Sequence, residues 1–218
     1  MRKTQLVTGH IYHIFNRGVN KNEIFLSQDD YKQFLNAAIH YKTKNTRYSY
    51  EKRFKISHDP VSLQSLQLNR ALKIDVIAYC LMPNHFHFLV KQESDRGITS
   101  FMRHLMNSYS HFVNLKYKRV GPLFQGRFKA VIVDSDEQLL HLSRYIHLNP
   151  LVSNLVSDLE SYPWSSYVSY IGKRVDNLAN SQAVLNSFKS KSDYRQFVLD
   201  QEDYARGLEN IKHLTNEE

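Results

Sequence analysis

The chain has 218 residues, 42% of them hydrophobic and 23% charged, which excludes a largely disordered protein and suits one domain with appendages or two small domains. No apolar run reaches the roughly 18 residues that span a bilayer, and the single cysteine, Cys80, excludes an internal disulfide, so we expect a cytoplasmic protein. The net charge of +8 favours a polyanionic partner such as nucleic acid, although an ordinary basic protein would show the same balance.

Three segments are predicted in the first third of the chain. Residues 10–18 alternate apolar and polar positions and end in a glycine, which predicts a strand. Residues 27–45 begin with Ser27, a helix-capping residue, and continue with two acids and apolar residues at helical spacing. They predict an amphipathic helix. Residues 46–70 are polar and basic and predict a long loop or insertion.

The next predicted elements are two strands joined by a tight turn, a helix and a fourth strand, over residues 71–82, 85–92, 97–120 and 123–133. Gly126 in the last of these strands indicates a bulge or a close backbone approach. Residues 136–150 predict a further helix, and we expect Pro150 to help stop it.

The order strand, helix, strand, strand, helix, strand, helix predicts an α+β fold. The simplest form is a ferredoxin-like antiparallel sheet with helices packed on one face, occupying residues 1–170. Residues 171–218 show no strand pattern and predict a C-terminal helical extension, with one or two short helices within 181–212. The aromatic segment 162–172 is expected to dock on the core.

Two histidines, His85 and His87, stand one residue apart in the predicted strand 85–92. Because strand side chains alternate, they share one face, and Phe86 and Phe88 take the other. Such a pair either packs within the core or belongs to a site, and a third group must decide between the two. The other histidines lack a pairing that points to one site, among them His10, His13, His104, His111 and His141.

The predicted helix 136–150 carries Tyr145 and Asn149 four residues apart, hence on one helical face. Two imidazoles, an amide oxygen and a phenol would make a compact polar cluster if this helix lay across the histidine strand. His147 lies two residues from Tyr145 and should face elsewhere. The main rival tyrosine, Tyr109, has a valine at the fourth following position, and we interpret it as a packing residue.

Five motifs in this order resemble those of one family. They are NRG (16–18), PNHFHFLV (83–90), GPLFQGRFKAVIV (121–133), YIHLNP (145–150) and WSSY (164–167). The His-hydrophobic-His pattern resembles that of HUH nucleases. The whole set resembles the IS200-like single-tyrosine transposases and, more narrowly, the REP-associated tyrosine transposases.

The resemblance implies a role for each residue of the cluster. His85 and His87 would be metal ligands, Asn149 the third protein ligand and Tyr145 the nucleophile. It favours Mg²⁺ or Mn²⁺, whereas two imidazoles by themselves also suit zinc. The implied activity is cleavage and strand transfer of hairpin-containing single-stranded DNA through a 5′-phosphotyrosine, that is, DNA transposition.

The implied chemistry meets a physical need. A phenol has a reference pKa of about 10 and is a poor nucleophile at neutral pH. A divalent cation that polarises a phosphate oxygen and stabilises the departing 3′ oxygen compensates for this. The phosphotyrosine ester retains the bond energy, so a later 3′-hydroxyl can reverse the step without ATP, an option that a water-using nuclease loses.

Basic residues interleaved with aromatic ones in 42–55 and 116–129 supply phosphate contacts and stacking faces for unpaired bases. The candidate DNA-binding residues are Lys116, Arg119, Arg127, Lys129 and Arg144. Each of them singly also fits a solvated surface charge. Asn16 and Arg17 match a motif of the resembling family, and their role is left open.

Two other functions fit the same residues. One is a catalytically silent regulator that binds hairpin DNA or RNA on the same scaffold. The other is a metallo-phosphodiesterase that uses water and forms no covalent species. In each case we expect a monomer or homodimer without a membrane partner.

Overall fold

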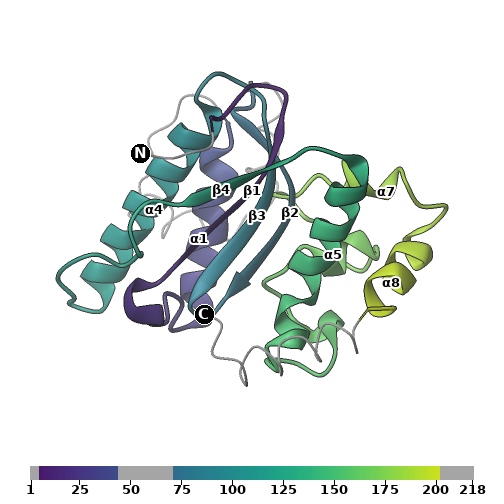
Figure 1. The fold of residues 1–218 in the computed structure, drawn as a ribbon. Coiled ribbons are helices and arrows are strands. Elements are labelled where there is room, and N and C mark those ends of the chain that lie inside the picture. Colours follow the sequence, from purple (N-terminus) through teal and green to yellow (C-terminus); the bar gives the residue numbers. More distant parts are fainter. Residues whose placement is uncertain (1–4, 44–70, 202–218) are drawn as a thin grey trace, which may run out of the picture.

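The structure is a computed structural model that describes residues 5–43 and 71–201 (Figure 1). Four strands form one antiparallel sheet in the order β2-β3-β1-β4. Their bounds are β1 Ile11–Arg17, β2 Ile74–Met82, β3 His85–Gln92 and β4 Lys129–Val133. The predicted insertion at 46–70 lies outside the described residues.

Two long helices, α1 (Gln28–Tyr41) and α4 (Gly97–Lys116), cover one face of this sheet (Figure 1). Phe86 and Phe88 of β3 point into the core beneath these helices. The path β1-α1-β2-β3-α4-β4 is the predicted ferredoxin-like α+β arrangement, which is confirmed. Ser27 caps α1 as predicted, in a capping box with Asp30.

The prediction that the helices share one face is wrong for α5 (Asp136–Val152), which packs on the opposite face (Figure 1). Leu89 of β3 and Cys80 of β2 join a second apolar core with Ile146 and Leu151 of α5. Both faces of β2 and β3 are therefore buried, and Cys80 is a buried free cysteine within the second core.

Shorter elements complete the described part of the chain. The remaining helical segments are η1 Val19–Lys21, η2 Leu159–Ser161, α6 Tyr167–Tyr170, α7 Gln182–Leu185 and α8 Lys191–Leu199. The aromatic segment docks as predicted, with Tyr162, Tyr167 and Tyr170 buried. None of the described helices is long and apolar enough to cross a membrane.

The predicted strand 123–133 is too long, because only Lys129–Val133 pairs continuously. Gly126 has a φ of +69°, a conformation that favours glycine, and no atom lies within 4 Å of the position that a Cβ would take. The glycine thus serves a turn rather than a close approach. The buried Asn16 donates to its carbonyl at 3.2 Å, which gives the NRG motif a structural role.

Pro150 does not stop α5, which continues to Val152. A proline removes its own N–H and crowds the preceding turn. Because Pro150 lies in the last turn, the helix loses little before Ser153 donates to the carbonyl of Asn149 at 3.0 Å and ends it. In contrast, α4 is shorter than predicted and ends at Lys116, four residues before the predicted end. Lys118, two residues later, has a φ of +51°.

Candidate active site

The histidine pair lies on the face of the sheet that carries α5. The ring centroids of His85 and His87 are 5.0 Å apart, at right angles. β3 turns Phe86 and Phe88 to the other side, as the alternation predicted. His87 is buried, at 7% exposure, and His85 is partly buried.

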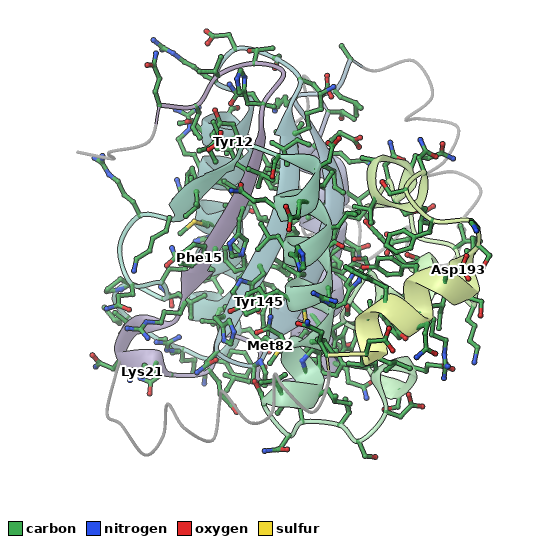
Figure 2. The ribbon with its side chains drawn as sticks, turned by 45° about the vertical axis from the view of Figure 1, so that its right-hand side comes forward. Tyr12, Phe15, Lys21, Met82, Tyr145 and Asp193 are labelled. Atoms are coloured by element: carbon green, nitrogen blue, oxygen red, sulfur yellow. The ribbon has the colours of Figure 1, made fainter. Side chains whose placement is uncertain are left out.

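Tyr145 lies on α5 where this helix passes in front of the sheet (Figure 2). Its ring stands edge-on to that of His87, with centroids 5.7 Å apart, and Tyr145 is 49% exposed. The structure therefore brings the predicted nucleophile next to the predicted ligand pair, within one chain, and a substrate can reach it.

Asn149 follows one turn later on the same face of α5. Its side-chain nitrogen donates to the backbone carbonyl of Tyr145 at 2.8 Å. This bond orients the amide and leaves the side-chain oxygen, Oδ1, as the atom that can bind a cation. Its assignment as a ligand stays a prediction.

His13 of β1 is the residue that the sequence did not reveal. Its Nε2 lies 2.9 Å from Nδ1 of His87, and the two rings stack with centroids 5.1 Å apart. Tyr145 also stands edge-on to His13, at 6.3 Å. Strand alternation gave a weak signal, because His13 shares a face with Phe15 and Arg17, but only the pairing of β1 with β3 brings it to His87.

Burial keeps the three imidazoles neutral. It lowers the pKa of His13 to about 4 and, together with the nearby charge of Arg17, that of His85 to about 4. The pKa of His87 falls well below its ordinary value through burial and the two neighbouring histidines. Neutral imidazoles carry the lone pairs that metal coordination requires.

This donor set fits one divalent cation. The Nδ1 atoms of His85 and His87 are engaged with Asn84 Oδ1 at 2.6 Å and with His13, so their Nε2 atoms are available. Within residues 5–43 and 71–201 there is no group of three His, Cys, Asp or Glu side chains placed to hold a metal. Asn149, substrate and water offer oxygen ligands, which Mg²⁺ and Mn²⁺ prefer.

Cationic side chains flank the imidazoles along the sheet. Arg17 is paired directly opposite His85 and is exposed, with Nε bonded to Gln125 Oε1 at 2.5 Å. Lys129 of β4 is exposed opposite Phe15, with its Nζ 5.8 Å from the centroid of that ring. Phe15 is in turn paired with His87. The sequence singled out Lys129 but left Arg17 without a role.

Two of the predicted DNA-binding cations are bound within the protein instead. Lys116 contacts the buried carboxylate of Asp30 at 2.7 Å and Ser27 Oγ at 2.9 Å, so it ties α4 to the start of α1. Arg144 is buried, stacks on the ring of Phe197 at 4.2 Å and donates to His141 Nδ1 at 2.6 Å. Because contacts within the protein occupy both charges, we expect a structural role for Lys116 and Arg144 in place of the predicted DNA contacts.

The other two candidates lie in loops. Arg127 is exposed immediately before β4, two residues from Lys129. Arg119 follows the end of α4, where its backbone N–H donates to the carbonyl of Asn114 at 2.9 Å. Their phosphate contacts stay predictions.

The rival residues are structural. Tyr109 is fully buried and donates to the carbonyl of Ile24 at 2.7 Å, as a packing residue would. His147 is fully buried and faces away from His85 and His87. Its Nδ1 lies 2.7 Å from Tyr194 Oη, and its Nε2 lies 2.7 Å from Ser166 Oγ. The bond to Tyr194 joins α5 to α8 and helps fix the helix that carries Tyr145.

Sequence and fold comparisons show which proteins this chain is similar to. Residues 62–149 match the family described as "Transposase IS200 like", a stretch that contains both histidines, Tyr145 and Asn149. The chain is thus similar to the IS200-like transposases over its site-bearing region, and the resemblance read from the motifs is confirmed.

Two further comparisons name REP-associated tyrosine transposases. A protein of Haemophilus influenzae named "Putative REP-associated tyrosine transposase" is 27% identical over 103 residues, 43% of this chain. The chain spans 58% of the length of that curated relative. A solved structure of a REP-associated tyrosine transposase bound to a REP hairpin shares the fold, with a TM-score of 0.55 and 15% identity, over 83% of this chain and 90% of the other.

Proposed function

We propose that this protein is a DNA transposase that cleaves single-stranded, hairpin-containing DNA and transfers the cut strand through a phosphotyrosine at Tyr145. The observation that carries the proposal is the ring of Tyr145 beside His87, half exposed, at the face where the neutral imidazoles gather. The matches to IS200-like and REP-associated transposases support it.

The Nε2 atoms of His85 and His87, with the side-chain oxygen of Asn149, would hold Mg²⁺ or Mn²⁺. Such an ion supplies Lewis-acid polarisation of a phosphate oxygen and charge stabilisation of the leaving oxygen. In the chemical step Tyr145 Oη bonds to phosphorus as the bond from phosphorus to the 3′ oxygen breaks. The phenolic proton leaves to solvent, and the 3′ oxygen gains one from solvent.

The reverse step uses the same atoms. A new 3′-hydroxyl oxygen bonds to phosphorus as the bond from phosphorus to Tyr145 Oη breaks; the hydroxyl proton leaves to solvent, and Tyr145 Oη gains one from solvent. The ring of His13 lies beside that of Tyr145 and stacks on that of Phe15, with the His13 and Phe15 centroids 4.9 Å apart. Arg17 lies two residues beyond Phe15 on β1, and Lys129 lies opposite Phe15 on β4, where cations can hold the phosphates of the bound strand. The hairpin as substrate is supported by the complex in which the structural relative was solved.

The test is an adduct assay with an end-labelled hairpin oligonucleotide and Mn²⁺ or Mg²⁺. Wild type should yield a downstream fragment linked to the protein through its 5′ phosphate and an upstream fragment with a free 3′-hydroxyl, whereas Tyr145→Phe should yield neither. Tyr117→Phe is the matched control, because the Tyr117 hydroxyl donates to Asp30 at 2.8 Å on the other side of the sheet. Binding of the hairpin without cleavage would favour the silent regulator, and cleavage without an adduct would favour the hydrolytic enzyme.

A further inference from the structure

Each histidine of the ligand pair makes a hydrogen bond through the same ring nitrogen. Nδ1 of His85 lies 2.6 Å from Asn84 Oδ1, and Nδ1 of His87 lies 2.9 Å from Nε2 of His13. One partner comes from the turn before β3 and the other from the adjacent strand, so the two bonds arise independently in the fold.

The bond to Asn84 fixes the proton of His85. Asn84 donates its side-chain N–H to the carbonyl of Lys21 at 3.1 Å, which sets the orientation of the amide and turns its oxygen toward His85. An amide oxygen only accepts, so Nδ1 of His85 must carry the proton. The lone pair of this neutral ring is then on Nε2.

The bond between His87 and His13 contains one proton, because a hydrogen bond between two ring nitrogens needs one donor and one acceptor. If His87 donates from Nδ1, its Nε2 also carries a lone pair, and the two ligand histidines present the same atom. His13 then accepts at Nε2 and bears its own proton on Nδ1. The opposite assignment would place an N–H on Nε2 of His87 and prevent it from binding a cation.

We infer that His13 and Asn84 are positioning residues that hold His87 and His85 in the Nδ1–H tautomer, with both Nε2 atoms ready for a divalent cation. The inference rests on the proposed function for the purpose of the site, although the tautomers themselves can be measured without metal. Partners of this kind set ring orientation and raise ligand basicity, and their loss typically costs 10–100-fold in metal affinity.

His13 acts through His87 and is not a third ligand. Its Nε2 is engaged with Nδ1 of His87, and the described part of the chain contains no three-histidine group with metal-binding geometry. The ring of His13 is also held by stacking on Phe15. A neutral acceptor suits this place, because a carboxylate would bring an additional charge into a buried cluster.

The first test needs no metal. Long-range ¹H–¹⁵N spectra of the full chain distinguish Nδ1–H from Nε2–H imidazoles. We expect His85 and His87 as Nδ1–H in wild type, and His87 still so in His13→Gln, because a glutamine oxygen can accept at the place of Nε2. In His13→Ala, His87 should become a mixture of tautomers. An Nε2–H tautomer for His87 in wild type would overturn the inference.

The second test measures Mn²⁺ affinity by electron paramagnetic resonance on the same proteins. His13→Ala should bind Mn²⁺ at least about tenfold more weakly than wild type, His13→Gln within about threefold of it, and the exposed His10→Ala control as wild type. Equal affinity of wild type and His13→Ala would overturn the inference. If His13→Ala does not fold, His13→Gln decides, because a tenfold loss there contradicts the acceptor role.

The two proposals fail separately. If wild type binds Mn²⁺ through His87, with the expected tautomers, but never forms a DNA adduct, the proposed function fails and the positioning role stands. If the adduct forms but wild type and His13→Ala bind Mn²⁺ with equal affinity, the positioning role fails and the function stands.

Discussion

The rings of Tyr145 and His87 meet edge to plane in a single chain, with centroids 5.7 Å apart and an interplanar angle of 85°. The helix that carries Tyr145 is fixed to the same chain by a buried core and by the bond of His147 to Tyr194 of α8. In this structure the phenol and the imidazoles therefore meet within one chain.

This geometry predicts that the tyrosine acts in cis. A mixture of Tyr145→Phe and His87→Ala proteins should form no more adduct on hairpin DNA than either variant by itself, because neither chain holds both groups. The amount of covalent adduct on a denaturing gel measures this. Recovery of a substantial share of wild-type adduct in the mixture would show exchange of α5 between subunits.

Lys129 is predicted to contact DNA phosphate. Lys129→Ala should weaken hairpin binding similarly for different sequences and lower the slope of log K against log salt by about 1, as the loss of one phosphate contact requires. Fluorescence anisotropy over a salt series measures both. Lys32→Ala is the control, because Lys32 is an exposed cation on α1, across the sheet. An unchanged slope for Lys129→Ala would place the strand elsewhere.

Lys116 is predicted to stabilise the fold and not to bind DNA. Lys116→Met should lower the free energy of unfolding by about 2 kcal/mol, less than for a fully buried pair, since Asp30 keeps Tyr117 and two backbone donors. Urea unfolding measures it. Lys32→Met, which breaks only an exposed pair with Asp29, should cost under about 0.5 kcal/mol. An unchanged stability with a changed salt slope in DNA binding would restore the original prediction for Lys116.

The same ion pair predicts a pH dependence. Burial raises the pKa of Asp30, but the hydrogen bonds from Lys116 and Tyr117 outweigh it and bring the pKa below its ordinary value of 3.8. A depressed carboxyl pKa contributes stability above 3.8, and this contribution is lost as the pH falls through the folded-state pKa. The stability difference between wild type and Lys116→Met should therefore shrink below that pH. A difference that stays constant down to acid unfolding would contradict this.

Much of the site follows from periodicity. The two-residue period of a strand places His85 and His87 on one face, and the four-residue spacing of a helix does the same for Tyr145 and Asn149. The order of elements likewise predicts the ferredoxin-like sheet. These regularities are local, so short stretches of sequence are enough to predict them.

Contacts between distant segments are less accessible to sequence. His13 reaches His87 only through the register of β1 on β3, and Lys116 meets a buried carboxylate 86 residues earlier. A charge pattern cannot say whether a cation faces solvent or a partner of this kind. Similarly, α5 packs on the second face because Ile146 and Leu151 contact an apolar surface on β2 and β3. Strand alternation in a half-buried sheet did not predict that this face is also buried.

Tandem mass spectrometry of the covalent product is the most direct measurement of the mechanism. Protein incubated with a hairpin oligonucleotide and Mn²⁺, then digested with nuclease and protease, should give a peptide containing YIHLNP with a 5′-linked nucleotide on Tyr145. A nucleotide on another residue, or attached through its 3′ phosphate, would contradict the role of Tyr145.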